Sequence, residues 1–258
     1  MLAAATLAAL LFAQGWLRLR RRGRRDLASW RRAGLAATGL GVALAGLVTP
    51  IDTIGEDDLL SVHMLQHVLI GDLAVALLVA AARGPLLVFL LPAPVLRPLS
   101  RSRAIRRTLG TLLAPRVAFC LWAANLAAWH VPALYDAALS HPLLHDLEHA
   151  CWVVAGLLVW TLLVDPGGHR RLTVGGRIAL AAALFAAGEV LTDVLVFSFD
   201  GLYPAYRGAY GISALTDQKL AGIAMMVEQL ATLGACVALL LRPRLRRARA
   251  ARLAASHA

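Results

Sequence analysis

The chain has 258 residues and a net charge of +11, and 59% of its residues are hydrophobic while only 16% are charged. A soluble domain would carry about a quarter charged residues. Here the apolar residues form continuous runs instead of amphipathic stripes, as in proteins surrounded by lipid, so a soluble globular fold is excluded. The three cysteines, Cys120, Cys151 and Cys236, form no CxxC motif, which argues against a disulfide framework.

The apolar runs predict an all-α membrane protein, a polytopic bundle of about seven transmembrane helices. A helix needs roughly 20 residues to cross a bilayer. In chain order the predicted spans cover residues 1–17, 33–49, 61–82, 116–129, 150–164, 178–199 and 217–241. After the third span, a short apolar segment interrupted by prolines and an arginine-bearing helix are predicted to stay at the interface. We therefore expect one transmembrane domain, residues 1–241, followed by a basic cytoplasmic tail, residues 242–258.

The arginines predict the orientation of this bundle. The four segments on one predicted side of the membrane hold 24 of the 26 basic residues, and only Arg207 and Lys219 fall elsewhere. Cytoplasmic loops are enriched in arginine and lysine, so the N-terminus is expected outside and the C-terminus in the cytoplasm. Orientation and anionic lipid explain the basic charge, and a nucleic-acid partner is not needed.

Histidines gather at the predicted outer ends of the spans. Four of the eight lie in the stretch from Trp129 to His149. A spacing of four residues puts two imidazoles on one face of a helix, one turn apart, where both can bind one metal ion. Asp217 begins the seventh span at the same depth, as an oxygen ligand or an N-cap. The candidate metal ligands are His63, His67, His130, His141, His145, His149 and Asp217.

Other side chains leave a functional and a structural interpretation open. Met64 lies between His63 and His67, where it could supply a soft thioether ligand or pack against a neighbouring helix. The predicted spans also contain acidic residues without a basic partner, which we expect to face the bundle interior because charge in lipid is costly. They could form a proton or metal path, or a polar cluster that holds helices together. These residues are Asp72, Glu189, Asp193 and Glu228.

The segment from His145 to His149 also matches H-x-x-E-H, the inverted zincin pattern, in which two histidines bind zinc and the glutamate is a general base. No peptidase-sized soluble domain accompanies the motif. Glu148 is therefore expected to face water or to orient a histidine from behind.

Three segments resemble the integral-membrane CtaG family of cytochrome c oxidase assembly factors, the multi-span kind associated with caa-type oxidases. They are HMLQH, WHVPALYDAALSHPLLHDLEH and TDQKLAGIAMM, and the resemblance covers the third to seventh predicted spans. It implies a role in producing an active haem–copper oxidase through copper handling on the outer side. Cytochrome c oxidase subunits or other copper-handling proteins are the implied partners. Lys219 departs from the polar residue usual at its position.

Sequence and resemblance together predict a non-enzymatic assembly factor in the plasma membrane, with a copper site on the extracytoplasmic side. Exposed imidazoles at that surface would suit exchange of the ion. Two alternatives stay open: a haem clamped between paired histidines, and a zinc hydrolase that uses His145, Glu148 and His149. A proton-coupled transporter would use the four buried acids, but no inverted repeat is visible.

Overall fold

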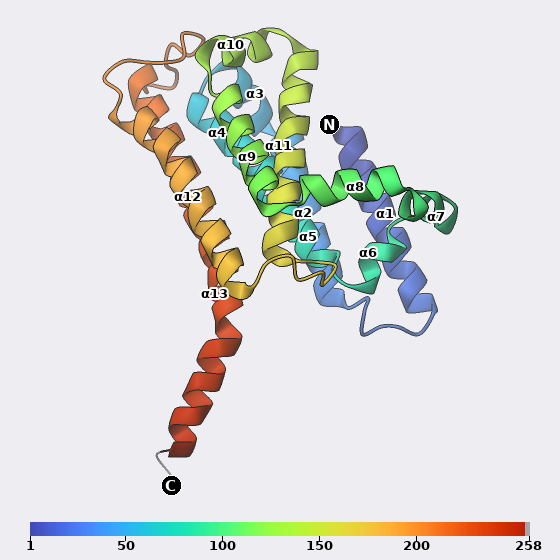
Figure 1. Cartoon of the computed structure of the whole chain (residues 1–258). Helices are drawn as coiled ribbons and strands as arrows, with labels where there is room; N and C mark the ends of the chain where they lie inside the picture. The colour runs from blue at the N-terminus through green and yellow to red at the C-terminus, as the bar shows by residue number, and fades with distance from the viewer. Residues whose placement is uncertain (256–258) are drawn as a thin grey trace.

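Helices make up the regular structure of the part of the chain that the computed structural model describes, residues 1–255, with side-chain surroundings for residues 1–247 (Figure 1). The prediction of an all-α protein is confirmed. In chain order the helices are α1 (Leu2–Arg21), α2 (Trp30–Val48), α3 (Pro50–Asp57), α4 (Leu60–Val68), the π-helical turn η1 (Leu69–Leu73), α5 (Ala74–Ala81), α6 (Pro85–Phe89), α7 (Ala93–Arg101), α8 (Arg103–Leu112), α9 (Pro115–Trp129), α10 (Pro132–Ser140), α11 (Pro142–Val164), α12 (Val174–Phe197) and α13 (Ala214–Ala255).

The protein is a multi-pass membrane protein. Five helical units are long and apolar enough to cross a bilayer alone: α1, α4–η1–α5 taken together, α11, α12 and α13. The pairs α2–α3 and α8–α9, bent by 44° and 68°, would raise the number of spans to seven. With 15 residues, α9 rises only about 22 Å, less than the ~30 Å of a hydrocarbon core. The fourth predicted span, 116–129, is therefore too short to cross by itself.

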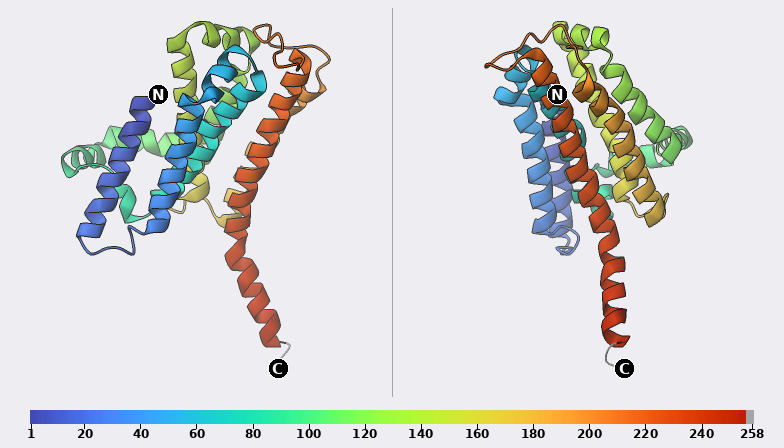
Figure 2. Two further views of the ribbon diagram at one scale, coloured as in Figure 1. Left: turned by 180° about the vertical axis from the view of Figure 1, so that it is seen from behind. Right: turned by 90° about the vertical axis from the view of Figure 1, so that its left-hand side faces the viewer.

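Two helices are longer than the membrane spans predicted within them. α11 begins at Pro142, where the sequence favours a helix start because proline suits the first turn, and it continues without a break through the predicted span 150–164. α13 continues through Leu241, where the sequence predicted the start of the tail, since alanine and arginine are good helix formers. Figure 2 shows this extension projecting from the bundle. Of the predicted tail, residues 256–258, including His257, lie outside the described residues.

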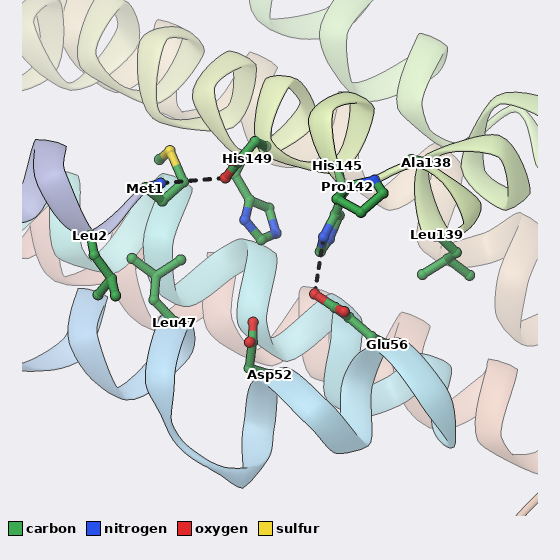
Figure 3. A pocket seen from close by; sticks show the side chains of 11 residues that line it. Met1, Leu2, Leu47, Asp52, Glu56, Ala138, Leu139, Pro142, His145 and His149 are labelled. Carbon is green, nitrogen blue, oxygen red and sulfur yellow. Dashed lines mark hydrogen bonds and ion pairs between the residues drawn. The ribbon is translucent and has the colours of Figure 1, made fainter.

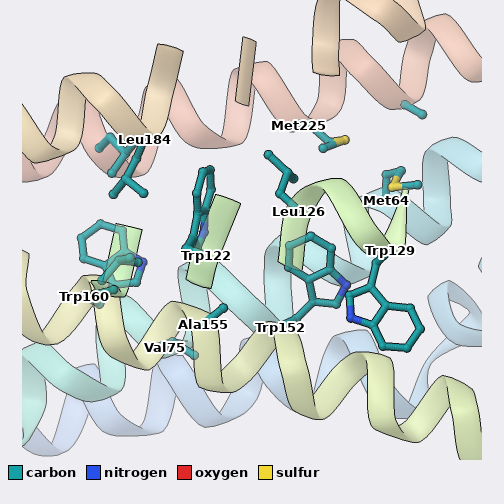
Figure 4. Close-up of a cluster of buried hydrophobic side chains, with 14 of the residues drawn as sticks. Met64, Val75, Trp122, Leu126, Trp129, Trp152, Ala155, Trp160, Leu184 and Met225 are labelled. Carbon is teal, nitrogen blue, oxygen red and sulfur yellow. The ribbon is translucent and has the colours of Figure 1, made fainter. Parts of the chain in front are cut away.

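The bundle has two distinct ends. Helices α3 and α10 lie at one end, together with the first turns of α4, α11 and α13 (Figure 1). We call it the histidine end. The opposite end carries the loop between α1 and α2 and the extension of α13, and we call it the arginine end. Between them, a core rich in tryptophan packs the helices together, and Figure 4 shows it.

The four predicted intramembrane acids do not all face the interior. Asp72 is partly buried and accepts a hydrogen bond from the indole of Trp160. Asp193, in contrast, is exposed. The buried stripe of α12 passes through Gly188 and Leu195, and Asp193 falls outside it. The expectation that every acid lies inside the bundle is wrong for this residue.

A close approach between η1 and α11 brings the two histidine-bearing helices together. A Cβ atom on Gly156 of α11 would collide with the carbonyl oxygen of Gly71 in η1, and one on Gly71 would lie 2.9 Å from the Cβ of Trp152. Only glycine permits backbones to meet at this distance, as in other membrane helix pairs. The π-helical turn begins two residues after His67, and such turns often occur at functional sites.

Replacing Gly156 by alanine is expected to destabilise the protein by about 1–3 kcal/mol, because a buried methyl group would push η1 and α11 apart. Unfolding of the purified protein in mild detergent measures the effect. Gly234→Ala is the matched control, since nothing lies within 4 Å of a Cβ at this exposed helical position. The control should be neutral or stabilising by up to about 1 kcal/mol. Equal stabilities of the two variants would contradict the close packing.

Candidate metal centre

Four imidazoles meet at the histidine end. His63 and His67 come from α4, and His145 and His149 come from the first turns of α11. One ring nitrogen from each lies within 4.8 Å of the others. All four residues are buried, with at most 8% of their surface exposed. The two i, i+4 pairs predicted from sequence therefore face each other across a helix interface, but they are not exposed as the sequence suggested.

A tyrosine sets the tautomer of His63. The hydroxyl of Tyr206 donates to the carbonyl oxygen of Gly55 at 2.7 Å, so its hydrogen is already used. The same oxygen lies 2.8 Å from Nδ1 of His63, and it must accept a hydrogen bond from that nitrogen. In the neutral ring Nε2 is then the unprotonated nitrogen, and its lone pair points into the cluster.

A carboxylate sets the tautomer of His145 in the same way. Nδ1 of His145 lies 3.0 Å from Oε1 of Glu56, which can only accept when ionised. Its Nε2 therefore also carries a lone pair, and it faces Nε2 of His63 at 3.2 Å. Nε2 of His67 lies 3.0 Å from the same atom of His63. Two facing lone pairs call for a proton or a metal ion between them.

Two of the nitrogen separations are close to those of a metal site. Metal–imidazole bonds of 2.0–2.1 Å in a tetrahedral centre separate the nitrogens by roughly 3.3 Å. The two measured separations from His63 are 3.0 and 3.2 Å. Histidine ligands in such sites donate their second nitrogen to a carboxylate, a carbonyl or another acceptor. Tyr206 and Glu56 supply this arrangement for His63 and His145.

Glu148 lies behind the cluster. The residue is only 1% exposed, and its Oε1 lies 3.6 Å from Nδ1 of His67. The indole of Trp152 donates to the same oxygen at 3.5 Å. Of the two positions expected from sequence, Glu148 takes the one beside a histidine and does not face water. A general base of a hydrolase would need access to water, so the H-x-x-E-H match finds no support in this geometry.

A cavity of about 250 Å³ leads to the cluster and is shown in Figure 3. His145 and His149 line it together with three carboxylate residues, Asp52, Glu56 and Asp146. We call it the acidic vestibule. Partial burial and the neighbouring carboxylates of Asp52 and other acids raise the pKa of Glu56 above its ordinary value. The N-terminal ammonium of Met1 also lines the vestibule and pairs with Asp146 at 3.3 Å. Asp52 and Glu56 supply the remaining negative charge, which favours cations over anions.

The remaining predicted ligands lie outside the four-nitrogen cluster. His141 is exposed at the N-cap of α11, and its Nδ1 donates to the carbonyl oxygen of Ala137. His130 is buried at the end of α9. Asp217 is fully buried, and its carboxylate accepts hydrogen bonds from the backbone amides of Leu60 and Ser61 at 2.7 and 3.1 Å. It therefore caps α4, a different helix from its own, and stabilises the helix that carries His63 and His67.

The sequence missed the side chains that orient the histidines. Tyr206 lies in the loop before α13, and Glu56 lies at the end of α3. The sequence indicated these two residues only by their location, since the tyrosine-rich and acidic loops fall on the same predicted side of the membrane as the histidines. Which tyrosine or carboxylate reaches a ring depends on how those loops fold back over the bundle, and spacing along the chain does not contain that information.

The chain matches one known protein family over most of its length. The cytochrome c oxidase caa3 assembly factor family (Caa3_CtaG) matches residues 10–247, which is most of the chain. The chain belongs to this family. The resemblance found in the sequence is thereby confirmed, and the match includes all seven candidate ligands. No curated protein and no solved structure matches it.

Membership in the Caa3_CtaG family gives the cluster its context. The family consists of assembly factors for cytochrome c oxidase, which suggests a non-catalytic role and implies association with the oxidase. The long apolar helices imply that the protein is surrounded by a lipid bilayer. A buried group of four histidines that could hold a metal ion is therefore present in a membrane-embedded oxidase assembly factor.

Replacing Tyr206 by phenylalanine is expected to destabilise the protein by about 1–3 kcal/mol, because Nδ1 of His63 and the carbonyl of Gly55 lose a buried partner. Thermal unfolding in detergent measures the change. Tyr210→Phe is the control, since its hydroxyl bonds the carboxylate of Asp58 at an exposed site and its loss should change stability by less than about 0.5 kcal/mol. Similar effects of the two substitutions would contradict the assigned hydrogen-bond chain.

Proposed function

We propose that this protein binds copper at His63, His67, His145 and His149 and supplies it during assembly of cytochrome c oxidase. One observation carries the proposal: the lone pairs of His63 and His145 face each other in a buried four-nitrogen cluster, and each ring is fixed from behind. A metal cation bound at these nitrogens would satisfy both lone pairs. Copper is the cargo in this account, and no reaction is catalysed.

The chemistry of the donors favours copper over the two alternatives. Imidazole nitrogens bind copper, and affinity for divalent ions of this row is highest for copper. A haem needs its two axial nitrogens about 4 Å apart on opposite faces of a macrocycle. Nε2 of His63 lies only 3.0 and 3.2 Å from Nε2 of His67 and of His145, so no macrocycle fits within these pairs. Zinc would suit four imidazoles, but a zinc hydrolase would also need a general base with access to water, and Glu148 is buried. The family's link to a haem–copper oxidase adds to the argument for copper.

The acidic vestibule provides a route for the ion in this proposal. Its carboxylates would attract a copper cation, and His145 and His149 would receive it first because they line both the vestibule and the cluster. His63 and His67 would then complete the ligand set. Release would follow the same path in reverse, towards a partner docked at the histidine end.

The orientation in the membrane is also part of the proposal. The sorting of 24 of 26 basic residues to the other side supports a histidine end that faces outside the plasma membrane, with the C-terminus in the cytoplasm. Cytochrome c oxidase subunits or other copper-handling proteins would then meet the vestibule from the extracytoplasmic side. Nucleic acid has no role in this account.

Oxidase assembly in cells tests the proposal. Cells that carry His63→Ala/His67→Ala in place of the wild-type protein should contain cytochrome c oxidase with less copper and less activity. His141→Ala is the matched control, because this histidine is exposed and lies outside the cluster. Both variants must reach wild-type amounts in the membrane. Wild-type copper content of the oxidase in the double variant would overturn the proposal.

The carboxylate behind His145 gives a second prediction. Glu56→Ala should weaken copper binding by about 10–100-fold, the usual effect of losing the group that orients a histidine ligand. Competition with a chelator measures the affinity of the purified protein. Asp57→Ala serves as the control, since the carboxylate of Asp57 is exposed and does not line the vestibule. Equal affinities of the two variants would show that Glu56 does not support the site.

A further inference from the structure

A second cavity, separate from the acidic vestibule, lies beside His67. It has a volume of about 30 Å³, enough for a small ion because a single water needs about 10–15 Å³. Its wall contains two thioethers, Met64 of α4 and Met225 of α13, and two imidazoles, His67 and His130. The polar side chains of Asp72 and Gln229 also line it. We call it the methionine chamber. His145 and His149 do not line it, and neither methionine lines the vestibule.

His130, which lines this chamber, has a buried ring nitrogen without a partner. Its Nδ1 lies 2.8 Å from the carbonyl oxygen of Leu126, which can only accept, so Nδ1 carries the hydrogen. Nε2 therefore bears a lone pair, and this atom is buried without a hydrogen-bond partner. The residue itself is 8% exposed. A neutral imidazole with an unused buried lone pair is costly unless it binds something.

The position of His130 is firmly set. The hydroxyl of Tyr203 donates to its backbone carbonyl at 3.1 Å. Its ring packs edge-on against the indole of Trp152, with centroids 5.8 Å apart. The unused nitrogen is thus fixed by the same contacts that build the core, and it is not a mobile surface group.

The two methionines bring soft donors to the same space. Met64 is 1% exposed and Met225 is 4% exposed, and they come from helices that Asp217 links by capping α4. Figure 4 shows both side chains in the tryptophan-rich core. Thioether sulfur and imidazole nitrogen together select Cu(I) among the common metal ions. Aliphatic side chains would fill the same core volume, but they would leave Nε2 of His130 with nothing to bind.

We propose that the methionine chamber is a second copper site, which binds Cu(I) through the sulfur atoms of Met64 and Met225 and through Nε2 of His130. This inference rests on the proposed function, since it takes the cargo to be copper. His67 joins the two sites, because its Nε2 lies in the four-histidine cluster while its ring lines the chamber. The protein would then hold two copper ions, one on nitrogen donors near the vestibule and one on mixed sulfur and nitrogen donors in the core.

X-ray absorption of selenomethionine-labelled protein tests the chamber directly. The label makes a methionine ligand visible as copper–selenium scattering, which the three cysteines cannot imitate. Protein in mild detergent is loaded with Cu(I) alone and without oxygen. The wild type should bind two copper ions per chain and show copper–selenium scattering. Met64→Leu/Met225→Leu, a swap that conserves volume, should bind one ion and lose that scattering.

Three further variants separate the possible results. Met226→Leu is the matched control, because this neighbouring methionine does not line the chamber, and it should behave as wild type. His130→Gln should also lose the second ion. His145→Ala/His149→Ala should lose only the ion of the four-histidine cluster and retain copper–selenium scattering.

Each outcome decides between the two proposals. One bound copper without selenium scattering in the wild type would overturn the methionine chamber and leave the four-histidine site standing. Selenium scattering with a copper content that His145→Ala/His149→Ala does not lower would support the chamber and contradict the four-histidine site. No bound copper in any protein would overturn both.

Discussion

The contact between Gly71 and Gly156 is the constraint on which the rest of the structure depends. These residues let η1 and α11 approach until backbone meets backbone. His67 lies four residues before Gly71, and His149 lies seven residues before Gly156. Because the contact fixes the separation of the two helices, it also brings Nε2 of His63 and His145 to 3.2 Å. A larger residue at either glycine would move imidazoles that it does not touch.

Interactions from other segments complete what the helix contact begins. Tyr206 from the loop before α13 and Glu56 from α3 fix the two tautomers. Asp217 caps α4 and so links α13 to the helix that carries His63. Three regions far apart in the chain, α3–α4, α11 and the loop leading into α13, therefore converge on one pair of facing nitrogen atoms. Such convergence is expensive in chain entropy, and it yields a site whose rings are held before any ion arrives.

Much of this could be predicted from the sequence, because it depends on local patterns. Apolar runs indicated the helices, and the i, i+4 spacing indicated that His63 pairs with His67 and His145 with His149. The same spacing also put His141 in this row, one turn before His145, as the weakest of the three candidates there. With its start at Pro142, His141 becomes the exposed N-cap. Likewise, Asp217 was a reasonable ligand until the fold brought the N-terminus of α4 to its carboxylate.

Burial was the property that sequence described least well. Imidazoles at helix ends were expected to be exposed, yet α3, α10 and the loop after α12 cover the histidine end (Figure 1). This burial matters energetically, because a buried lone pair without a partner is costly while an exposed one is hydrated. Asp193 shows the opposite error, since an acid in an apolar run was placed inside the bundle although its helix face is open.

Pulsed electron paramagnetic resonance of the Cu(II)-loaded protein tests the central claim most directly, because it counts the imidazoles bound to one copper ion. The account predicts several imidazole ligands in the wild type, one fewer after each single substitution of His63, His67, His145 or His149 by alanine, and an unchanged spectrum for His141→Ala. An unchanged spectrum after substitution of any of the four, or a loss of ligand in His141→Ala, would contradict a copper centre built from these two helices.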